Sequence, residues 1–305
     1  MPEGLQLSDA DRAMLNGEKG PAPQLAMSIL VRMAEVYGAG ALMDISQAHI
    51  DSTIYLGDAT LEFAERLSSL GARVVVPTSL NVSGVDECGW KDWAVAPEWA
   101  AKAARQMLAY ERMGAVPTWT CAPYQTKMRP SFGQQIAWGE SNAIAFANSV
   151  IGARTERYPD LLDICCAITG RVPAVGLHLT ENRGGQMLLR LADCPIALQQ
   201  DDQFFGVLGH LVGKLAGDLI PVITGIQVEP LEDQLKAFSA SVASSGRVAL
   251  FHIVGITPEA PTLDAAFQGR APIATRRCWT AATGRRRSLR CRSSYGWRTS
   301  MGRAS

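Results

Sequence analysis

The sequence lacks the features that mark several common protein classes. Its 305 residues contain no run of about 18 apolar residues, so no membrane-spanning helix is expected. The N-terminus has no basic segment followed by an apolar core, which argues against a signal peptide. Seven cysteines in a chain of this length do not form a disulfide framework. These absences together favour a cytoplasmic protein with free or metal-bound thiols.

Several short motifs of catalysis and cofactor binding are also absent. There is no C-x-x-C pair, so a local metal motif is missing. No G-x-G-x-x-G or Walker pattern appears, which argues against a phosphate-cradling loop. The G-x-S-x-G elbow of serine hydrolases is missing as well.

Acidic residues are absent from the last 35 positions. Residues 271–305 contain nine Arg and no Lys, Asp or Glu, which leaves 20 basic residues against all 29 acidic ones in 1–270. The net charge of zero therefore hides an acidic body and a basic tail. The tail could be a nucleic-acid-binding arm or a solvated extension. Its abrupt change of composition favours a third interpretation, out-of-frame translation.

The body contains alternating strand and helix patterns. Apolar residues at helical spacing, with Gly and Pro at the ends, predict helices at 9–15, 24–37, 59–70, 97–113, 139–151, 160–169, 203–215 and 230–244. Short apolar runs predict strands at 41–45, 73–77, 116–120, 173–178, 219–223 and 247–252. Such alternation indicates an α/β fold with a mostly parallel sheet covered on both faces.

Chemically capable side chains occur where predicted strands end. His49, Ser79, Asn81, Cys121 and His178 each lie at or just after such an end. Ligands bind beyond the carboxyl ends of strands in open α/β sheets. The sequence therefore predicts that these residues share one site.

The stretch that begins at Cys121 has the highest density of side chains that could bind a ligand or take part in catalysis. The thiol can hold iron or zinc or act as a nucleophile, although a lone cysteine is more often a small buried residue. Glu140, Ser141 and Asn142 open the following helix, and they either cap it or place an anion such as a substrate carboxylate at its N-terminus. Arg154 is a candidate for binding the same carboxylate.

Several phrases of the sequence, taken in order, resemble one family. They lie at 46–51, 77–81, 120–124, 136–143, 147–155, 176–179, 211–214 and 252–260. Their order is similar to that of aconitase X, the large-subunit-like branch of the aconitase superfamily, and the resemblance covers about 25–270. Each phrase alone is weak, but eight in order are highly specific.

The resemblance implies a three-layer α/β/α, aconitase-like fold and a lyase that removes water from a small hydroxy acid. An iron or iron–sulfur centre would act as the Lewis acid. Bacterial members are similar to cis-3-hydroxy-L-proline dehydratases and archaeal members to phosphomevalonate dehydratases, and the absence of a separate phosphate site favours hydroxyproline. A small swivelling domain, fused or separate, is the implied partner, whereas nucleic acid and membranes are not.

The resemblance also implies roles for individual residues. Cys121 would be an iron ligand. The implied catalytic residues are His49, Ser79, Asn81, Glu140 and Ser141. The implied substrate-binding residues are Tyr124, Asn142 and Arg154.

The chain departs from the family after residue 270. Relatives are expected to continue for more than a hundred residues that supply further ligands, so 1–270 is interpreted as a partial catalytic region and 271–305 as an atypical tail. A C-terminally incomplete member is expected to be inactive by itself. Two further hypotheses stay open: a binding module whose basic tail engages nucleic acid, and a zinc or thiol hydrolase built on Cys121 and a histidine.

Overall fold

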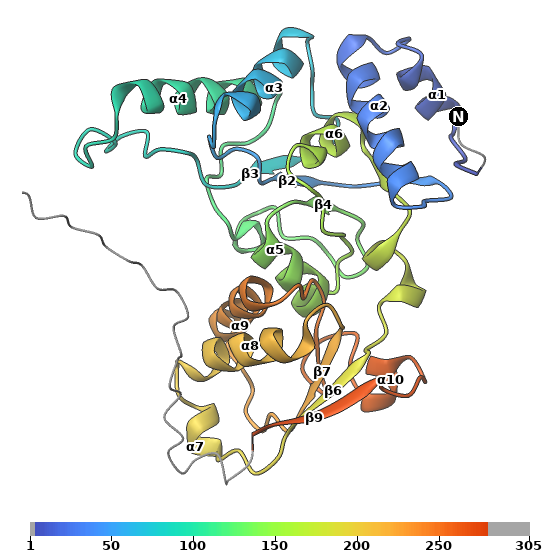
Figure 1. The fold of residues 1–305 in the computed structure, drawn as a ribbon, viewed down its shortest axis with the longest axis vertical. Helices are drawn as coiled ribbons and strands as arrows, with labels where there is room; N and C mark the ends of the chain where they lie inside the picture. The colour runs from blue at the N-terminus through green and yellow to red at the C-terminus, as the bar shows by residue number, and fades with distance from the viewer. Residues whose placement is uncertain (1–3, 280–305) are drawn as a thin grey trace, which may run out of the picture.

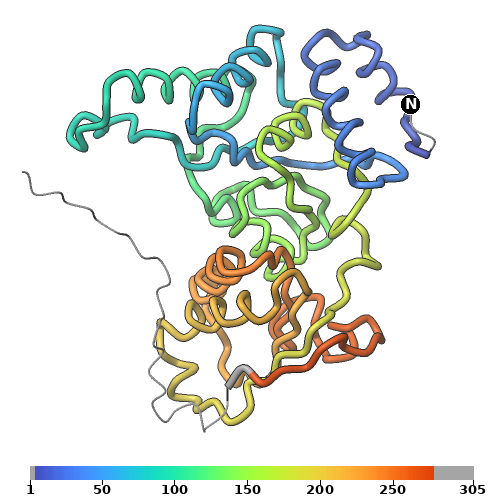
Figure 2. Tube along the Cα trace, viewed as in Figure 1, coloured from blue at the N-terminus to red at the C-terminus, as the bar shows by residue number. Residues whose placement is uncertain are grey.

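The computed structural model describes residues 4–279 and arranges them in two lobes (Figure 1). The blue-to-green part of the chain forms one lobe and the yellow-to-red part forms the other, with α5 (Ser141–Phe146) lying between them (Figure 2). Within this range no helix has the length and apolar character needed to cross a membrane.

The first lobe is built on a parallel sheet with strand order β3-β2-β4. Its strands are β2 (Ala48–Ile50), β3 (Thr78–Leu80) and β4 (Ala137–Trp138). A separate antiparallel pair joins β1 (Leu42–Asp44) to β5 (Arg171–Pro173). The helices of this lobe are α1 (Asp9–Leu15), α2 (Pro21–Val36), α3 (Asp58–Ser69), α4 (Pro97–Arg112) and α6 (Leu162–Thr169).

The two faces of this sheet have different characters. Because side chains alternate along a strand, Ala48, Ile50 and Leu80 point to one face, where they join a core formed with α2, α4 and α6. His49 and Ser79 point to the opposite face. That face turns toward α5, η1 (Pro123–Gln125) and the second lobe.

The second lobe is built on a four-stranded parallel sheet with order β8-β7-β6-β9. Its strands are β6 (Met187–Leu191), β7 (Pro221–Thr224), β8 (His252–Ile253) and β9 (Ala274–Trp279). Its helices are α7 (Ile196–Gln199), α8 (Phe204–Ala216), α9 (Glu232–Ser245) and α10 (Leu263–Phe267). Helices α8 and α9 pack together over one face, and α10 contacts β7 on the other (Figure 1).

One core crosses from the first lobe into the second. It joins Tyr124, Trp138 and Phe146 to Phe238 and Phe251. Helix α5 packs against α9, and Phe238 meets Phe251 with ring centroids 4.7 Å apart. The turn after α5 continues as a π-helical segment, η2 (Ala147–Ile151). The polar face of the first sheet is therefore closed by residues that also belong to the second lobe.

The mixed α/β architecture with parallel sheets agrees with the sequence-based expectation, but there are two parallel sheets rather than one. The predicted helices are all present within a few residues, except that 139–151 divides into α5 and η2. The strand predicted at 73–77 is wrong, since β3 begins at Thr78. Residues 116–120 form only an isolated bridge between Val116 and Ser79, and 176–178 form the 3-10 turn η3 (Gly176–His178).

Strands β2, β4, β6 and β9 were not predicted from the sequence. Strand β6 was missed, and β9 lies inside the range expected to be an unpatterned tail. The described residues Thr275, Arg276 and Arg277 of β9 are exposed, so this edge strand shows no apolar alternation. The remainder of that tail, 280–305, lies outside the described residues.

Candidate active site

Two rows of polar side chains mark the carboxyl ends of the first sheet. His49 is the register partner of both Ser79 and Trp138, so these three form one row across β3-β2-β4. Three further polar side chains lie just past the ends of these strands and form a second row. That second row consists of Asp51, Asn81 and Glu140. The hydrogen bond between Asn81 and Asp51 and the effect of the Asp51 charge on Glu140 show that the second row comes together from three distant segments.

The His49–Ser79 pair forms the centre of the first row. His49 Nδ1 lies 2.8 Å from Ser79 Oγ, and both side chains are fully buried. Burial disfavours the imidazolium and lowers the pKa of His49 to about 3. The imidazole is therefore neutral near neutral pH. If Nδ1 donates to Ser79, Nε2 is left as a free proton acceptor.

Asp51 and Asn81 form the second polar pair. The Asn81 amide donates a hydrogen bond to an oxygen of Asp51. Burial raises the pKa of Asp51, and the bond from Asn81 opposes that rise. Asp51 therefore holds its proton to higher pH than an exposed aspartate does.

Glu140 caps α5 with its own side chain. Its carboxylate accepts hydrogen bonds from the backbone N–H of Ala143 at 2.9 Å and of Asn142 at 3.3 Å. Burial raises the pKa of Glu140, and the charge of Asp51 adds to the rise. The expectation that this helix start holds a substrate carboxylate is corrected, because Glu140 already occupies those N–H groups.

Cys121 and Tyr124 approach the same region from the loop before η1. The Asn142 amide donates to the Cys121 carbonyl at 3.3 Å, and the Tyr124 hydroxyl donates to the Asn142 carbonyl oxygen at 3.3 Å. The Tyr124 ring stacks on Phe146 with centroids 3.8 Å apart. The Cys121 side chain is half-buried. The structure thus joins Cys121, Tyr124 and Asn142, as the sequence led us to expect.

Three buried polar atoms of these rows have no hydrogen-bond partner within residues 4–279. They are His49 Nε2, Asn81 Oδ1 and Trp138 Nε1. His49 and Trp138 are neighbours, with ring centroids 6.0 Å apart. Buried polar atoms are normally satisfied, so three on one sheet face indicate a place where a ligand or solvent completes the bonding.

Three expected site residues lie elsewhere or play no visible part. Arg154 bonds the carbonyl of His178 at 3.2 Å and pairs by backbone with Gln135, which precedes β4 at the opposite end of the sheet. His178 has both ring nitrogens engaged, Nε2 with Tyr158 and Nδ1 with Gln135. Its placement in the shared site was wrong. Ser141 is exposed on the first turn of α5.

Asp163 is a functional candidate that sequence reasoning missed. It accepts a 2.7 Å hydrogen bond from the backbone N–H of Asp51, although the two residues are 112 positions apart. The available signal was a lone carboxylate inside the apolar run 161–168. The apolar spacing predicts only a helix at 160–169.

No three His, Cys, Asp or Glu side chains within the described part of the chain come together in a way that could hold a metal ion. The Asn142 amide contacts Cys121 at its backbone carbonyl and not at its thiol. The residues present therefore do not fit a complete iron or iron–sulfur centre.

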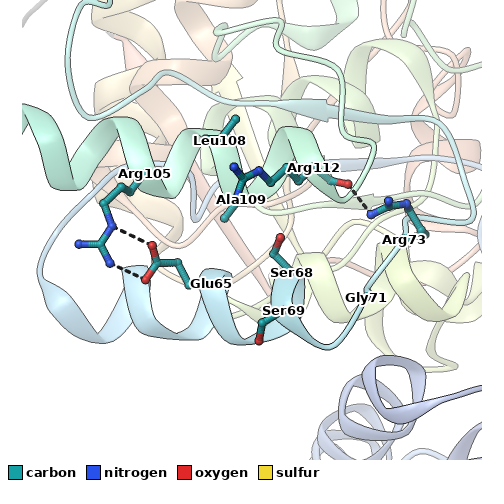
Figure 3. Close-up of a pocket in the computed structure, with 9 residues that line it drawn as sticks. All are labelled: Glu65, Ser68, Ser69, Gly71, Arg73, Arg105, Leu108, Ala109 and Arg112. Carbon is teal, nitrogen blue, oxygen red and sulfur yellow. Dashed lines mark hydrogen bonds and ion pairs between the residues drawn. The ribbon is translucent and has the colours of Figure 1, made fainter.

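A separate groove of about 640 Å³ lies between α3 and α4 (Figure 3). Arg105 makes two hydrogen bonds to Glu65, at 2.7 and 2.8 Å, and Arg73 donates to the Arg112 carbonyl. None of the residues in the two polar rows lines this groove. Its size does not make it part of the candidate active site.

Comparison with known proteins identifies the family. Residues 4–181 match the family model of the aconitase X first domain, and residues 185–281 match that of the aconitase X second domain. The chain belongs to the aconitase X family. It is similar to the crystal structure of Thermococcus kodakaraensis aconitase X (holo-form), with a TM-score of 0.76 and 33% identity over 89% of this chain and 66% of that one.

The curated relatives are dehydratases. A cis-3-hydroxy-L-proline dehydratase of Pseudomonas aeruginosa is 49% identical over 90% of this chain, and one of Hypocrea jecorina is 47% identical over 87%. A phosphomevalonate dehydratase large subunit of Methanothermobacter thermautotrophicus is 40% identical over 83%. The chain spans 47%, 45% and 62% of these proteins, respectively.

Proposed function

We propose that this chain forms the substrate-binding part of a hydro-lyase that dehydrates a small hydroxy acid, most specifically cis-3-hydroxy-L-proline. The observation that carries the proposal is the set of three unpartnered buried atoms on His49, Asn81 and Trp138. The higher identity to the two cis-3-hydroxy-L-proline dehydratases supports this substrate over phosphomevalonate. Family membership supports the reaction class.

The proposed chemistry uses the neutral imidazole of His49 and the carboxyl group of Asp51. Removing water across C2 and C3 requires a base at the C2 hydrogen and a proton for the departing hydroxyl. His49 Nε2 is the proposed base, with Nδ1 held by Ser79. Asp51 is the proposed proton donor, because burial shifts its pKa in the direction that favours the protonated form. The C3–O bond breaks, the C2–C3 double bond forms, and the enamine rearranges to a cyclic imine.

The iron or iron–sulfur centre expected from the family is not supplied by residues 4–279 alone. We retain Cys121 as a proposed ligand, and no step assigned above passes through a metal. The relatives named as large subunits support a proposed small-subunit partner. The free thiols, among them Cys88, Cys121 and Cys194, are compatible with a proposed cytoplasmic location.

Isothermal titration calorimetry tests the proposal with three ligands: cis-3-hydroxy-L-proline, L-proline and phosphomevalonate. We expect saturable binding of cis-3-hydroxy-L-proline, and weaker binding of L-proline, which lacks the hydroxyl. The Ser79→Ala variant should bind more weakly because His49 loses its partner. Ser68→Ala, the same change in the α3–α4 groove, serves as the matched control.

Each ligand outcome decides between the candidates. Tighter binding of phosphomevalonate would transfer the assignment to the second group of relatives. If wild type and Ser79→Ala bind cis-3-hydroxy-L-proline with equal affinity, the two polar rows do not form the substrate-binding site.

A further inference from the structure

A buried carboxylate supports the turn that carries Asp51. Asp163, the second residue of α6, is fully buried. No Lys, Arg or His forms a salt bridge with it among the described residues. A buried carboxylate without a cation is costly unless hydrogen bonds compensate. Such a residue on a core helix therefore calls for an explanation.

The hydrogen bonds of Asp163 require a carboxylate. Oδ2 accepts from the backbone N–H of Asp51 at 2.7 Å and of Ser52 at 3.4 Å. Oδ1 accepts from the Ser52 hydroxyl at 3.2 Å and the Ile164 N–H at 2.7 Å. An asparagine has only one acceptor oxygen. In asparagine, an NH₂ group replaces the second oxygen, and this group would face an N–H or O–H donor instead of accepting its hydrogen bond.

The glycine that follows β4 leaves room for these hydrogen bonds. A Cβ on Gly139 would lie 2.8 Å from Asp51 Cβ and 2.9 Å from Asp163 Oδ2. Both distances are shorter than real carbon contacts allow. The segments that carry Asp51, Gly139 and Asp163 can therefore lie this close together because residue 139 has no side chain.

We infer that Asp163 is the positioning residue that fixes the turn after β2 and so directs the Asp51 carboxyl group toward Asn81 in the active site. Ser52 extends the support to α4, since its hydroxyl lies 2.9 Å from the Tyr110 hydroxyl. The role of Asp51 in catalysis rests on the proposed function. The hydrogen bonds that hold its backbone do not.

Nuclear magnetic resonance of the whole chain tests this inference with Asp163→Asn. The Asp51 amide proton should move upfield as it loses a carboxylate acceptor, and the titration midpoint of the Asp51 carboxyl should change. Affinity for cis-3-hydroxy-L-proline should fall about tenfold, the effect of one lost buried hydrogen bond. Asp202→Asn is the matched control, because this exposed aspartate lies in the second lobe and makes no hydrogen bond to the turn.

Unchanged Asp51 amide and carboxyl signals in folded Asp163→Asn protein would overturn the inference. If that variant does not fold, the wild type decides, because its Asp51 amide resonance should follow the titration of Asp163, whose pKa burial raises to about 7. Tyr110, Cys165 and the Asp51 carboxyl also face Asp163. Burial raises the pKa values of Tyr110 and Cys165, so they stay neutral there, and the Asp51 carboxyl signal separates the titration of Asp51 from that of Asp163. A flat amide response would also overturn it. Absent ligand binding with a normal amide response would instead count against the proposed function.

Discussion

At the residue scale, burial shifts the pKa values of neighbouring groups in opposite directions. It lowers the pKa of His49 to about 3 and raises the pKa values of Asp51 and Glu140. An elimination requires an unprotonated base and a proton donor, and the proposed function assigns these roles to His49 and Asp51. The same burial makes these groups costly for the fold, so their effects are measurable without substrate.

Replacing His49 should change how stability depends on pH. The folded pKa of about 3 lies below the ordinary value of 6.5, so the unfolded chain takes up the proton first as pH falls. The His49 contribution is complete above pH 6.5 and decreases on acidification. Between pH 6.5 and 5, His49→Gln should lose about 2 kcal/mol less stability than wild type, measured by denaturant unfolding.

The control for this measurement is His210→Gln, an exposed histidine on α8, which should retain the wild-type pH slope. The raised pKa of Asp163 acts in the opposite direction over the same range, since its contribution is lost as pH rises toward 7. Only the difference between variant and wild type isolates His49. Identical slopes for His49→Gln and wild type would show that this imidazole is not held neutral.

Adding one methyl group at Gly139 should displace Asp51. The new Cβ would contact Asp51 Cβ at 2.8 Å, and relieving such overpacking costs about 1–3 kcal/mol. Thermal unfolding of Gly139→Ala should report this loss. Gly40→Ala is the control, because an added Cβ there meets nothing within 4 Å. Equal stability of the two variants would mean that the end of β4 is not tightly packed.

At the element scale, the segment between the lobes is fixed by one buried arginine. Arg183, directly after η4 (Thr180–Asn182), is bonded to Glu259 at 2.7 and 2.9 Å. It also donates to the Asn148 and Leu177 carbonyls at 2.9 and 2.8 Å. Arg183 thereby links Asn148 and Leu177, which precede it in the chain, to Glu259 in the loop after β8.

Removing that arginine should destabilise the chain strongly. Arg183→Met leaves Glu259 without its partner, and breaking a buried ion pair costs about 3–5 kcal/mol. Arg105→Met breaks the exposed pair with Glu65 and should cost less than about 1 kcal/mol. Chemical denaturation of both variants provides the comparison. The account of the connection fails if the two losses are similar.

The elements of this fold were more predictable than its strand register. Helices such as 97–112 follow from apolar spacing, whereas β2, β3 and β4 have only two or three residues each and carry almost no period. His49 and Ser79 lie inside the short strands β2 and β3 rather than beyond the strands predicted at 41–45 and 73–77, so the sequence predicted their neighbourhood but not their register. Arg154 and His178 were misplaced because a strand pattern does not say which end of the sheet a later segment reaches.

At the scale of the whole molecule, the active-site face is closed by both lobes. Tyr124 and Trp138 belong to the region that matches the aconitase X first domain, while Phe238 and Phe251 belong to the second, and all four share one core. The polar rows lie beside this shared core. Ligand binding should therefore change the environment of residues in both regions, and not only of residues in the first sheet.

The most direct test of the account is a titration of the ¹⁵N-labelled chain with cis-3-hydroxy-L-proline. The account predicts saturable chemical-shift changes of the Trp138 indole N–H and of the Asp51 and Asn81 signals. L-Proline at the same concentration should cause much smaller changes. No response at these residues, or shifts confined to Arg73 and Arg112 in the α3–α4 groove, would contradict it.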